Sequence, residues 1–259
     1  MNYQIAIPSY KREKTIKEKT LTLLERYNIN PEKIKIFVAS QNEMLKYKDS
    51  LKNTPYGNSI VQGVPTIGMQ RNFIENYYPE GERLMMFDDD LTGVKKKNGK
   101  KLDEVEDLEK EIIFKGFSEA EKLGSKCFGI YAASNAYFMK DRIYNKLCYI
   151  IGSMFGVIVE KNDFLRRATN HGEDYEYSIR QYIQNGVLCR LDNYTVISNY
   201  YKEEGGLQTV RTKEYVHKSI KKIEEMFPEY CKMYIRKSTG FAELRLRDNS
   251  GNKKQEALF

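Results

Sequence analysis

A chain of 259 residues with 41% hydrophobic and 31% charged residues is large enough to bury the core of one α/β domain. No apolar run approaches the roughly 20 residues that cross a bilayer, and the apolar start of the chain is too short for a signal peptide. We therefore expect no membrane partner and a cytoplasmic protein, in the host cytoplasm if it is viral. Most of the net charge of +7 arises in residues 209–259, where 12 Lys/Arg face 7 Asp/Glu, and this indicates either a polyanionic partner or a solvated basic face.

Short apolar segments alternate with amphipathic ones along the first 90 residues. Strands are predicted at residues 3–8, 33–40, 59–65 and 83–87, with helices at 13–27, 43–51 and 68–77 between them. This alternation predicts βαβ units and a mainly parallel sheet. Ligands bind beyond the carboxyl ends of such strands, so we expect the loops after residues 8, 40 and 87 to converge.

The second half of the chain is less regular. Residues 95–101 (KKKNGKK) predict an exposed basic loop with a turn at Asn98-Gly99. Further strands are predicted at 127–133, within 149–159, at 187–190 and at 194–197, with helices at 108–123, 175–185 and 213–227 and a basic tail behind them. The four cysteines form no CxxC pair, which favours reduced thiols over a zinc site or a disulfide framework.

Three adjacent carboxylates, Asp88, Asp89 and Asp90, follow the apolar strand RLMMF directly. Their mutual repulsion makes it costly to keep all three ionised, and a divalent cation removes that cost. Mn²⁺ and Mg²⁺ prefer such oxygens and leave positions open for phosphates. At a strand end the first and third residues project to the same side, so Asp88 and Asp90 are the predicted metal ligands, with Asp89 turned toward the sugar or the protein. The alternative is a solvated acidic turn that caps the next element.

The order of motifs IAIPSYKR, a second strand ending at Ser40, GMQRNFI, LMMFDDD and HGEDYEY resembles that of GT-A glycosyltransferases. Within these, the sequence looks most similar to the TET-associated glycosyltransferase family, whose members are linked to the glycosylation of hydroxymethylated bases in DNA. The resemblance implies an α/β, Rossmann-like and mainly parallel sheet flanked by helices over residues 1–210. A small helical, basic extension, 211–259, is expected to pack on the same domain.

The resemblance also implies a nucleotide-sugar site. The residues that match it are Pro8, Ser9, Tyr10, Arg12, Ser40, Gln41, Arg71, Asn72, Asp88 and Asp89. Tyr10 would stack on the uracil base, and Arg12 and Arg71 would meet the phosphates. An exposed arginine on an amphipathic helix is an equally simple interpretation of Arg71.

On the acceptor side, Glu173 and Asp174 match the acidic pair that GT-A enzymes place at the start of a helix. Asp174 is the predicted catalytic base of an inverting enzyme, or orients the acceptor in a retaining one. Both carboxylates also suit an ordinary helix N-terminus. His171 beside this pair and His217 are further candidates, although His217 fits a surface helix, and Gly205-Gly206 either approaches a phosphate or forms a turn.

The implied activity is transfer of a hexose, glucose, from a UDP-sugar to a hydroxymethylated pyrimidine in DNA such as 5-hydroxymethylcytosine, with Mn²⁺ or Mg²⁺ as cofactor. Two alternatives remain open. One is a GT-A glycosyltransferase acting on a protein, glycan or small hydroxyl compound, and the other is a non-catalytic, basic nucleic-acid-binding protein. A phosphoryl- or nucleotidyltransferase is disfavoured because the chain has no Gly-x-x-x-x-Gly-Lys loop.

Overall fold

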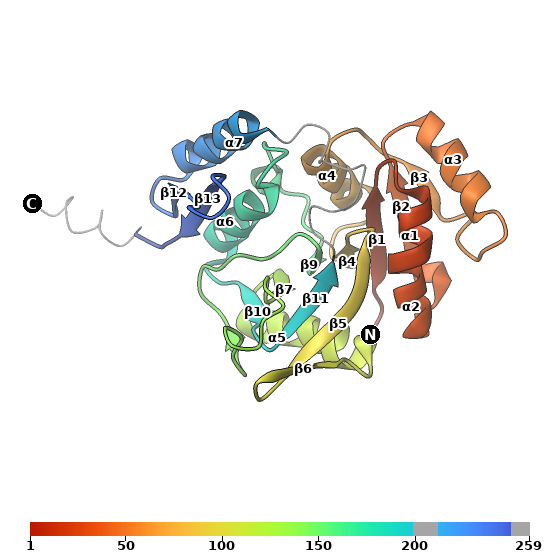
Figure 1. The fold of residues 1–259 in the computed structure, drawn as a ribbon, viewed down its shortest axis with the longest axis horizontal. Coiled ribbons are helices and arrows are strands. Elements are labelled where there is room, and N and C mark those ends of the chain that lie inside the picture. The colour runs from red at the N-terminus through yellow and green to blue at the C-terminus, as the bar shows by residue number, and fades with distance from the viewer. Residues whose placement is uncertain (199–211, 250–259) are drawn as a thin grey trace, which may run out of the picture.

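The computed structural model describes residues 1–198 and 212–249, and the predicted loop at Gly205 and Gly206 lies outside them. Figure 1 shows a central sheet with helices packed around it. Its strands follow the order β3-β2-β1-β4-β9-β7-β10-β8. Their bounds in that order are Ile60–Gln62, Ile34–Val38, Gln4–Ser9, Arg83–Phe87, Met154–Ile158, Cys127–Ile130, Cys189–Leu191 and Ile143–Tyr144.

Alternate side chains of the strands enter two separate cores, one on each face of the sheet. Ile5 and Ile7 of β1 join one core, while Ala6 joins the other. The first core is covered by the helical run α1 (Glu13–Ile16), η1 (Lys17–Leu21) and α2 (Thr22–Arg26), by α3 (Gln41–Leu51), and by η3 (Glu109–Phe114) with α5 (Lys115–Leu123). The second is covered by α4 (Ile67–Tyr77), α6 (Glu173–Asn185) and α7 (Lys213–Met226). The predicted α/β architecture with a mainly parallel sheet is confirmed.

Two strands of this sheet run against the others. β9 pairs antiparallel with β4 and β7, and β8 pairs antiparallel with β10. The apolar, glycine-interrupted segment 149–159 thus contributes one strand. A Cβ at Gly156 of β9 would lie 2.1 Å from the ring of Phe128, so this glycine makes room for an aromatic side chain on the neighbouring strand.

The prediction of an exposed loop at residues 95–101 is wrong. β5 (Leu91–Asn98) and β6 (Lys101–Glu104) form a hairpin, which β11 (Tyr194–Ser198) extends into a second sheet of order β11-β5-β6. Leu91 and Val94 are buried, and this apolar start anchors a strand whose lysine-rich end alone suggested a loop. The predicted turn is confirmed, because Gly99 takes a φ of 57° between paired residues Asn98 and Lys101.

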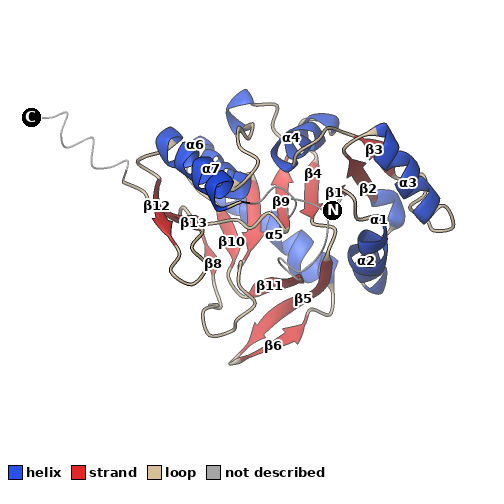
Figure 2. Cartoon of the chain, turned by 45° about the horizontal axis from the view of Figure 1, so that its top comes forward, coloured by secondary structure: helices blue, strands red, loops and turns tan. Residues whose placement is uncertain are grey.

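The basic segment after residue 227 contains two strands that the sequence pattern did not predict. β12 (Cys231–Ile235) and β13 (Ala242–Leu246) pair as an antiparallel ribbon beside α7 and α6 (Figures 1 and 2). All four cysteines are free and buried, as expected of reduced thiols. Across the two described stretches, no helix has the length and apolar character needed to cross a bilayer.

Candidate active site

Three segments meet at the edge of the sheet where β1 and β4 end. Ser9 closes β1, Asp88 follows β4, and Ser153 precedes β9. The Asp88 amide donates to the Ser153 carbonyl at 2.9 Å. β9 runs antiparallel to its neighbour β4, so β9 begins at the edge of the sheet where β4 ends. Residues distant in sequence therefore converge at this edge.

Asp89 turns toward the protein and fastens the loop after β4 to the loop after β1. Its Oδ2 accepts a hydrogen bond from Ser9 at 2.5 Å, and its Oδ1 binds Arg12 Nη1 at 2.9 Å. The Tyr47 hydroxyl of α3 bonds Ser9 Oγ at 2.7 Å and accepts from the Arg12 amide at 2.9 Å. Burial raises the pKa of Asp89, and the Arg12 guanidinium opposes that rise. This carboxylate therefore holds the shape of the site.

Asp88 faces a buried arginine. Arg71 Nη2 lies 3.0 Å from Asp88 Oδ1 and donates to the Gly152 carbonyl at 2.7 Å, while Nη1 pairs with Glu173. The Arg71 side chain is 3% exposed, so it is not a surface arginine, whereas that of Asp88 is 34% exposed. Burial of the loop raises the pKa of Asp88 to about 7, Arg71 lowers it, and Asp90 and Asp89 raise it further. Asp88 is thus a partly exposed carboxylate in a crowded field of charge.

A π-helical turn supports the aspartate loop from below. Thr20 in η1 is fully buried, donates from Oγ1 to the Asp88 carbonyl at 2.7 Å, and accepts from the Leu91 amide at 2.9 Å. Its hydroxyl satisfies the carbonyl of the first aspartate and the amide directly after the triplet. Wider turns of this kind are frequent at functional sites, and here the turn places a hydroxyl where a loop needs it.

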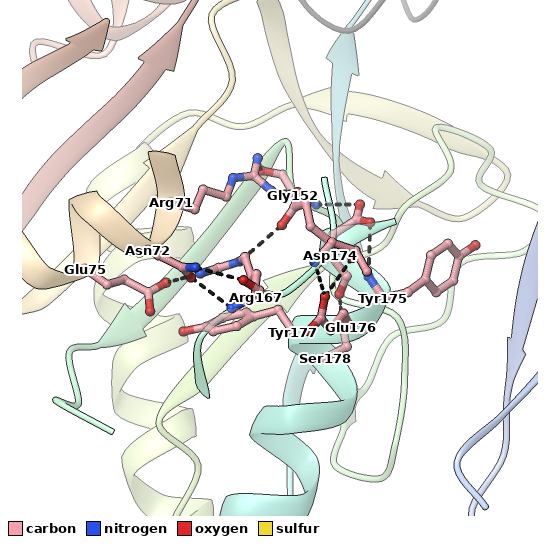
Figure 3. A network of polar contacts seen from close by, with 12 residues as sticks. Arg71, Asn72, Glu75, Gly152, Arg167, Asp174, Tyr175, Glu176, Tyr177 and Ser178 are labelled. Carbon is pink, nitrogen blue, oxygen red and sulfur yellow. Dashed lines mark hydrogen bonds and ion pairs between the residues drawn. The ribbon is translucent and has the colours of Figure 1, made fainter. Parts of the chain in front are cut away.

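Glu173, the first residue of α6, is buried between two arginines. It pairs with Arg71, and its Oε2 lies 3.1 Å from Arg167 Nε. Arg167 is itself completely buried, with Nη1 2.9 Å from Glu75 Oε1 and its guanidinium 3.6 Å from the centre of the Tyr177 ring. Figure 3 shows Arg71, Glu75 and Arg167 beside the first turn of α6. Glu173 therefore connects the site to a buried ionic network.

Asp174 lies on the other side of that first turn. Its Oδ2 accepts a hydrogen bond from the Tyr149 hydroxyl. The same oxygen accepts from the Gly152 amide at 3.3 Å (Figure 3). The rings of Tyr149 and Tyr175 stack with centres 4.2 Å apart, which fixes the donor hydroxyl. Burial and the Asp174 charge raise the pKa of Tyr149, so it remains a neutral donor. Asp174 keeps its carboxylate partly exposed and anchored.

Asp88 and Asp90 would supply only some of the ligands that a divalent metal ion needs. Asp90 Oδ1 accepts from Ser198 at 2.9 Å and Oδ2 lies 3.5 Å from Arg12. Within residues 1–198 and 212–249, no three His, Cys, Asp or Glu side chains form a metal-binding cluster. Mg²⁺-type ions are commonly held by one or two carboxylates completed by substrate phosphates and waters, and a pair of carboxylates at a strand end suits that arrangement.

The remaining predicted residues of the first two loops are arranged around the same edge. Pro8 is buried within β1. Tyr10 is 39% exposed, and Lys11 Nζ lies 5.1 Å from the centre of its ring. Ser40 caps α3 by accepting from the Glu43 amide at 3.4 Å, and Gln41 is exposed. Tyr10 and Gln41 thus present side chains to solvent.

Three other candidates have different surroundings. The amide of Asn72 is bonded to the main chain of Arg167 in both directions, each at 2.9 Å, which joins α4 to the segment before α6. His171 packs edge-on against Tyr215 with ring centres 6.2 Å apart. His217 is exposed on α7.

Sequence reasoning missed Thr20, Tyr47, Gly152 and Arg167. A Cβ at Gly152 would lie 2.3 Å from Arg71 Nη1, so any larger residue here would force the guanidinium to move. The glycine in the apolar run 149–159 was a usable signal for a close approach. Thr20 and Tyr47 lie inside predicted helices and Arg167 lies between elements, and no sequence pattern distinguished them.

No protein-family model matches this sequence, and no curated protein matches it. The fold is similar to that of S. aureus TarS 1–349 in complex with UDP-GlcNAc, with a TM-score of 0.58 and 15% identity over 87% of this chain and 66% of that one. A second TarS structure has a TM-score of 0.54 at 14% identity, and the match covers 88% of this chain and 40% of that one. The chain therefore spans slightly less than two thirds of TarS 1–349.

Another similar structure is glucosyl-3-phosphoglycerate synthase from Mycobacterium tuberculosis in complex with Mn²⁺ and UDP-glucose. Its TM-score is 0.53 at 8% identity, over 95% of this chain and 86% of that chain. Identities this low bear on the fold and not on the activity. The strand order, the two helical layers and these similarities together identify the fold of this chain as that of GT-A glycosyltransferases.

Proposed function

We propose that this chain is a metal-dependent glycosyltransferase that moves a hexose, glucose, from a UDP-sugar to a hydroxymethylated pyrimidine base in DNA. The observation that carries the proposal is the meeting of Asp88, Arg71 and the Glu173–Asp174 pair at one edge of the sheet. The donor class is supported by TarS and glucosyl-3-phosphoglycerate synthase, which have this fold and were crystallised with UDP-GlcNAc and UDP-glucose.

On the donor side, the reaction needs positive charge near the departing diphosphate, because sugar transfer has an oxocarbenium-like transition state and leaves negative charge behind. Asp88 and Asp90 would hold Mn²⁺ or Mg²⁺, which when bound neutralises that charge. Arg71 and Arg12 lie within ion-pair distance of the same aspartates and add fixed positive charge. Asp89 keeps the loop in place through Ser9 and Arg12.

On the acceptor side, a hydroxyl group must lose a proton as it attacks the sugar. In an inverting reaction Asp174 takes this proton, and in a retaining reaction it orients the acceptor. The Tyr149 hydroxyl and the Gly152 amide bind one oxygen of Asp174, and the Tyr175 amide donates to the other at 3.0 Å, so the carboxylate is held in place. Glu173 is enclosed by Arg71 and Arg167, so its role is to position its neighbours.

The DNA acceptor rests on the resemblance of the motifs and on the positive charge of the C-terminal part. An enzyme that modifies a base within a duplex must flip the base out, and a positively charged surface that holds the backbone assists this step. A glycosyltransferase acting on a protein, glycan or small hydroxyl compound is the competing assignment.

The test is to incubate the protein with Mn²⁺, a panel of nucleotide sugars, and DNA with or without 5-hydroxymethylcytosine or 5-hydroxymethyluracil. Mass spectrometry of the digested nucleosides should detect a hexose adduct only with hydroxymethylated DNA and a UDP-sugar. Asp88→Asn should remove the adduct. Asp103→Asn on the exposed strand β6 is the matched control and should keep it. Unchanged DNA with every donor, together with transfer to a non-DNA hydroxyl, would discard the DNA acceptor.

A further inference from the structure

The β12–β13 ribbon forms a small sheet of its own at one end of the molecule (Figures 1 and 2). Its inner face is apolar. Cys231, Ala242 and Leu244 are buried in the same core as α7. One face of the ribbon therefore packs on the core, and the alternate side chains of each strand point to the opposite face.

The outer face of the ribbon is basic. Its side chains, by strand parity and cross-strand register, are Lys232, Tyr234, Arg236, Glu243, Arg245 and Arg247. Lys232 stands directly opposite Arg245, a like-charge pair that destabilises a ladder unless anions compensate it. Glu224 compensates Lys232 at 3.0 Å. Neither Arg245 nor Arg247 takes part in a salt bridge with any other residue that the structure describes, and both are exposed.

We propose that this outer face, centred on Arg245 and Arg247, binds the phosphate backbone of duplex DNA and so presents the acceptor to the enzyme. The inference rests on the proposed function, and it assigns the surface on which the DNA acceptor binds. Arginine forks match phosphate oxygens in charge and geometry. A two-stranded antiparallel ribbon also has the dimensions that the major groove admits, about 12 Å in width.

The ribbon is coupled to the candidate active site through α6. The Tyr182 hydroxyl donates to Asp248 just after β13 at 2.7 Å, and its ring lies 6.4 Å from that of Tyr230 just before β12. Asp174 lies eight residues before Tyr182 on the same helix, which is about 12 Å along its axis. The ribbon and Asp174 are thus attached to the same helix.

The experiment measures binding of the full chain to a fluorescent duplex by anisotropy between 50 and about 300 mM salt, without any sugar donor. Arg245→Gln/Arg247→Gln should weaken binding about 10- to 100-fold at 100 mM salt and flatten the slope of log K against log salt by about 2. The matched control is Lys100→Gln/Lys101→Gln, which removes two charges from the exposed tip of the β5–β6 hairpin and should leave both quantities nearly unchanged. Equal melting temperatures would show that all variants fold.

Three outcomes would overturn the inference. The first is that the arginine changes leave duplex affinity unaffected, and the second is that the lysine control loses more duplex affinity than the arginine variant. The third is that the arginine changes weaken binding to vesicles of anionic lipids but not binding to the duplex. Transfer to free 5-hydroxymethyl-2′-deoxycytidine is measured alongside. If the arginine variant still transfers sugar to the free nucleoside but no longer to DNA, the result supports DNA binding by the ribbon. If no protein, wild type included, transfers sugar to the nucleoside, the result counts against the proposed function, and the ribbon is judged on the binding measurements alone.

Discussion

Arg71 carries one positive charge that two carboxylates from different parts of the chain share. Asp88 lies at the end of β4 and Glu173 at the start of α6, and the guanidinium also binds the Gly152 carbonyl. A buried charge without a partner is far more costly than the pair, so each member depends on the others. Removal of Arg71 therefore changes both the stability of the fold and the charge on Asp88.

We expect Arg71→Met to lower the free energy of unfolding by about 3–5 kcal/mol, because Glu173 loses one of its two buried partners. Urea denaturation monitored by circular dichroism measures this change. Arg71→Met/Glu173→Met is the control. It should regain part of the lost stability, because no buried carboxylate is then left without its arginine partner. Equal stability of wild type and Arg71→Met would show that the network does not stabilise the fold.

At the scale of single residues, the sequence indicated candidate residues for the site but not how the fold encloses them. Three adjacent acids after an apolar strand were visible as a site, and GMQRNFI drew attention to Arg71. The burial of Arg71 and the partnership of Arg167 with Glu75 depend on how α4 and α6 approach each other. No local pattern contains that tertiary distance.

The helical run that covers the first core contains a wider turn whose function is local. Thr20 in η1 bridges the Asp88 carbonyl and the Leu91 amide. Thr20→Val keeps the shape and removes the hydroxyl, so two buried main-chain groups lose their partner. We expect a loss of about 1–3 kcal/mol in urea denaturation and weaker binding of UDP with Mn²⁺. Thr20→Ser should retain most of both, and a fully stable Thr20→Val would contradict the role given to the hydroxyl.

Glu224 fixes α7 to the ribbon. It accepts from Lys221 at 2.8 Å, from Lys232 at 3.0 Å and from the Met233 amide at 3.1 Å, and these bonds lower its pKa from 4.5 to about 2. A lowered pKa in the folded state stabilises the protein above pH 4.5, and this contribution disappears as the pH falls toward 2.

Glu224→Gln should therefore reduce stability by about 1 kcal/mol at pH 7, with the deficit narrowing between pH 4.5 and 2. Urea midpoints for both proteins at pH 7, 4 and 3 measure it, and Glu225→Gln on the exposed side of the same helix is the control. A constant deficit across this range would exclude the ionised form of Glu224 as its source.

Among the elements, those with alternating apolar residues were predictable, and those that depend on pairing were not. The four strands before Asp88 appear where the pattern placed them, apart from a shorter β3. β5 contains three consecutive lysines and β6 begins with another, so their sequence resembles a loop, although Leu91 and Val94 are buried in the core. The β12–β13 ribbon was missed for the same reason, because only one face of it is apolar.

At the scale of the whole molecule, one antiparallel strand in a mainly parallel sheet decides where the site forms. β9 runs opposite to β4 and so brings Gly152 and Ser153 to the edge where Asp88 ends its strand. Periodicity predicts strands but not their direction, and this feature could not be read from the sequence. The resemblance of the motif order to GT-A enzymes supplied the architecture that the pattern alone left open.

If the site binds donor and metal together, both should stabilise the whole fold. A UDP-sugar with Mn²⁺ at about 100 times its dissociation constant adds about 2.7 kcal/mol, which for a chain of this size raises the melting temperature by about 5–10 °C. Thermal unfolding with UDP-glucose, Mn²⁺ and each alone measures the effect. EDTA should remove it, and Asp88→Asn should lack it while the control Asp103→Asn keeps it. The same shift in the presence of EDTA would show that the donor binds without a metal.

A crystal grown with Mn²⁺ and UDP-glucose tests the central claim most directly, with diffraction collected near the manganese absorption edge. The account predicts an anomalous peak that joins the carboxylate of Asp88 to the diphosphate, with the sugar between Arg71 and Asp174. A nucleotide bound elsewhere, or a manganese peak that Asp88 and Asp90 do not contact, would contradict it.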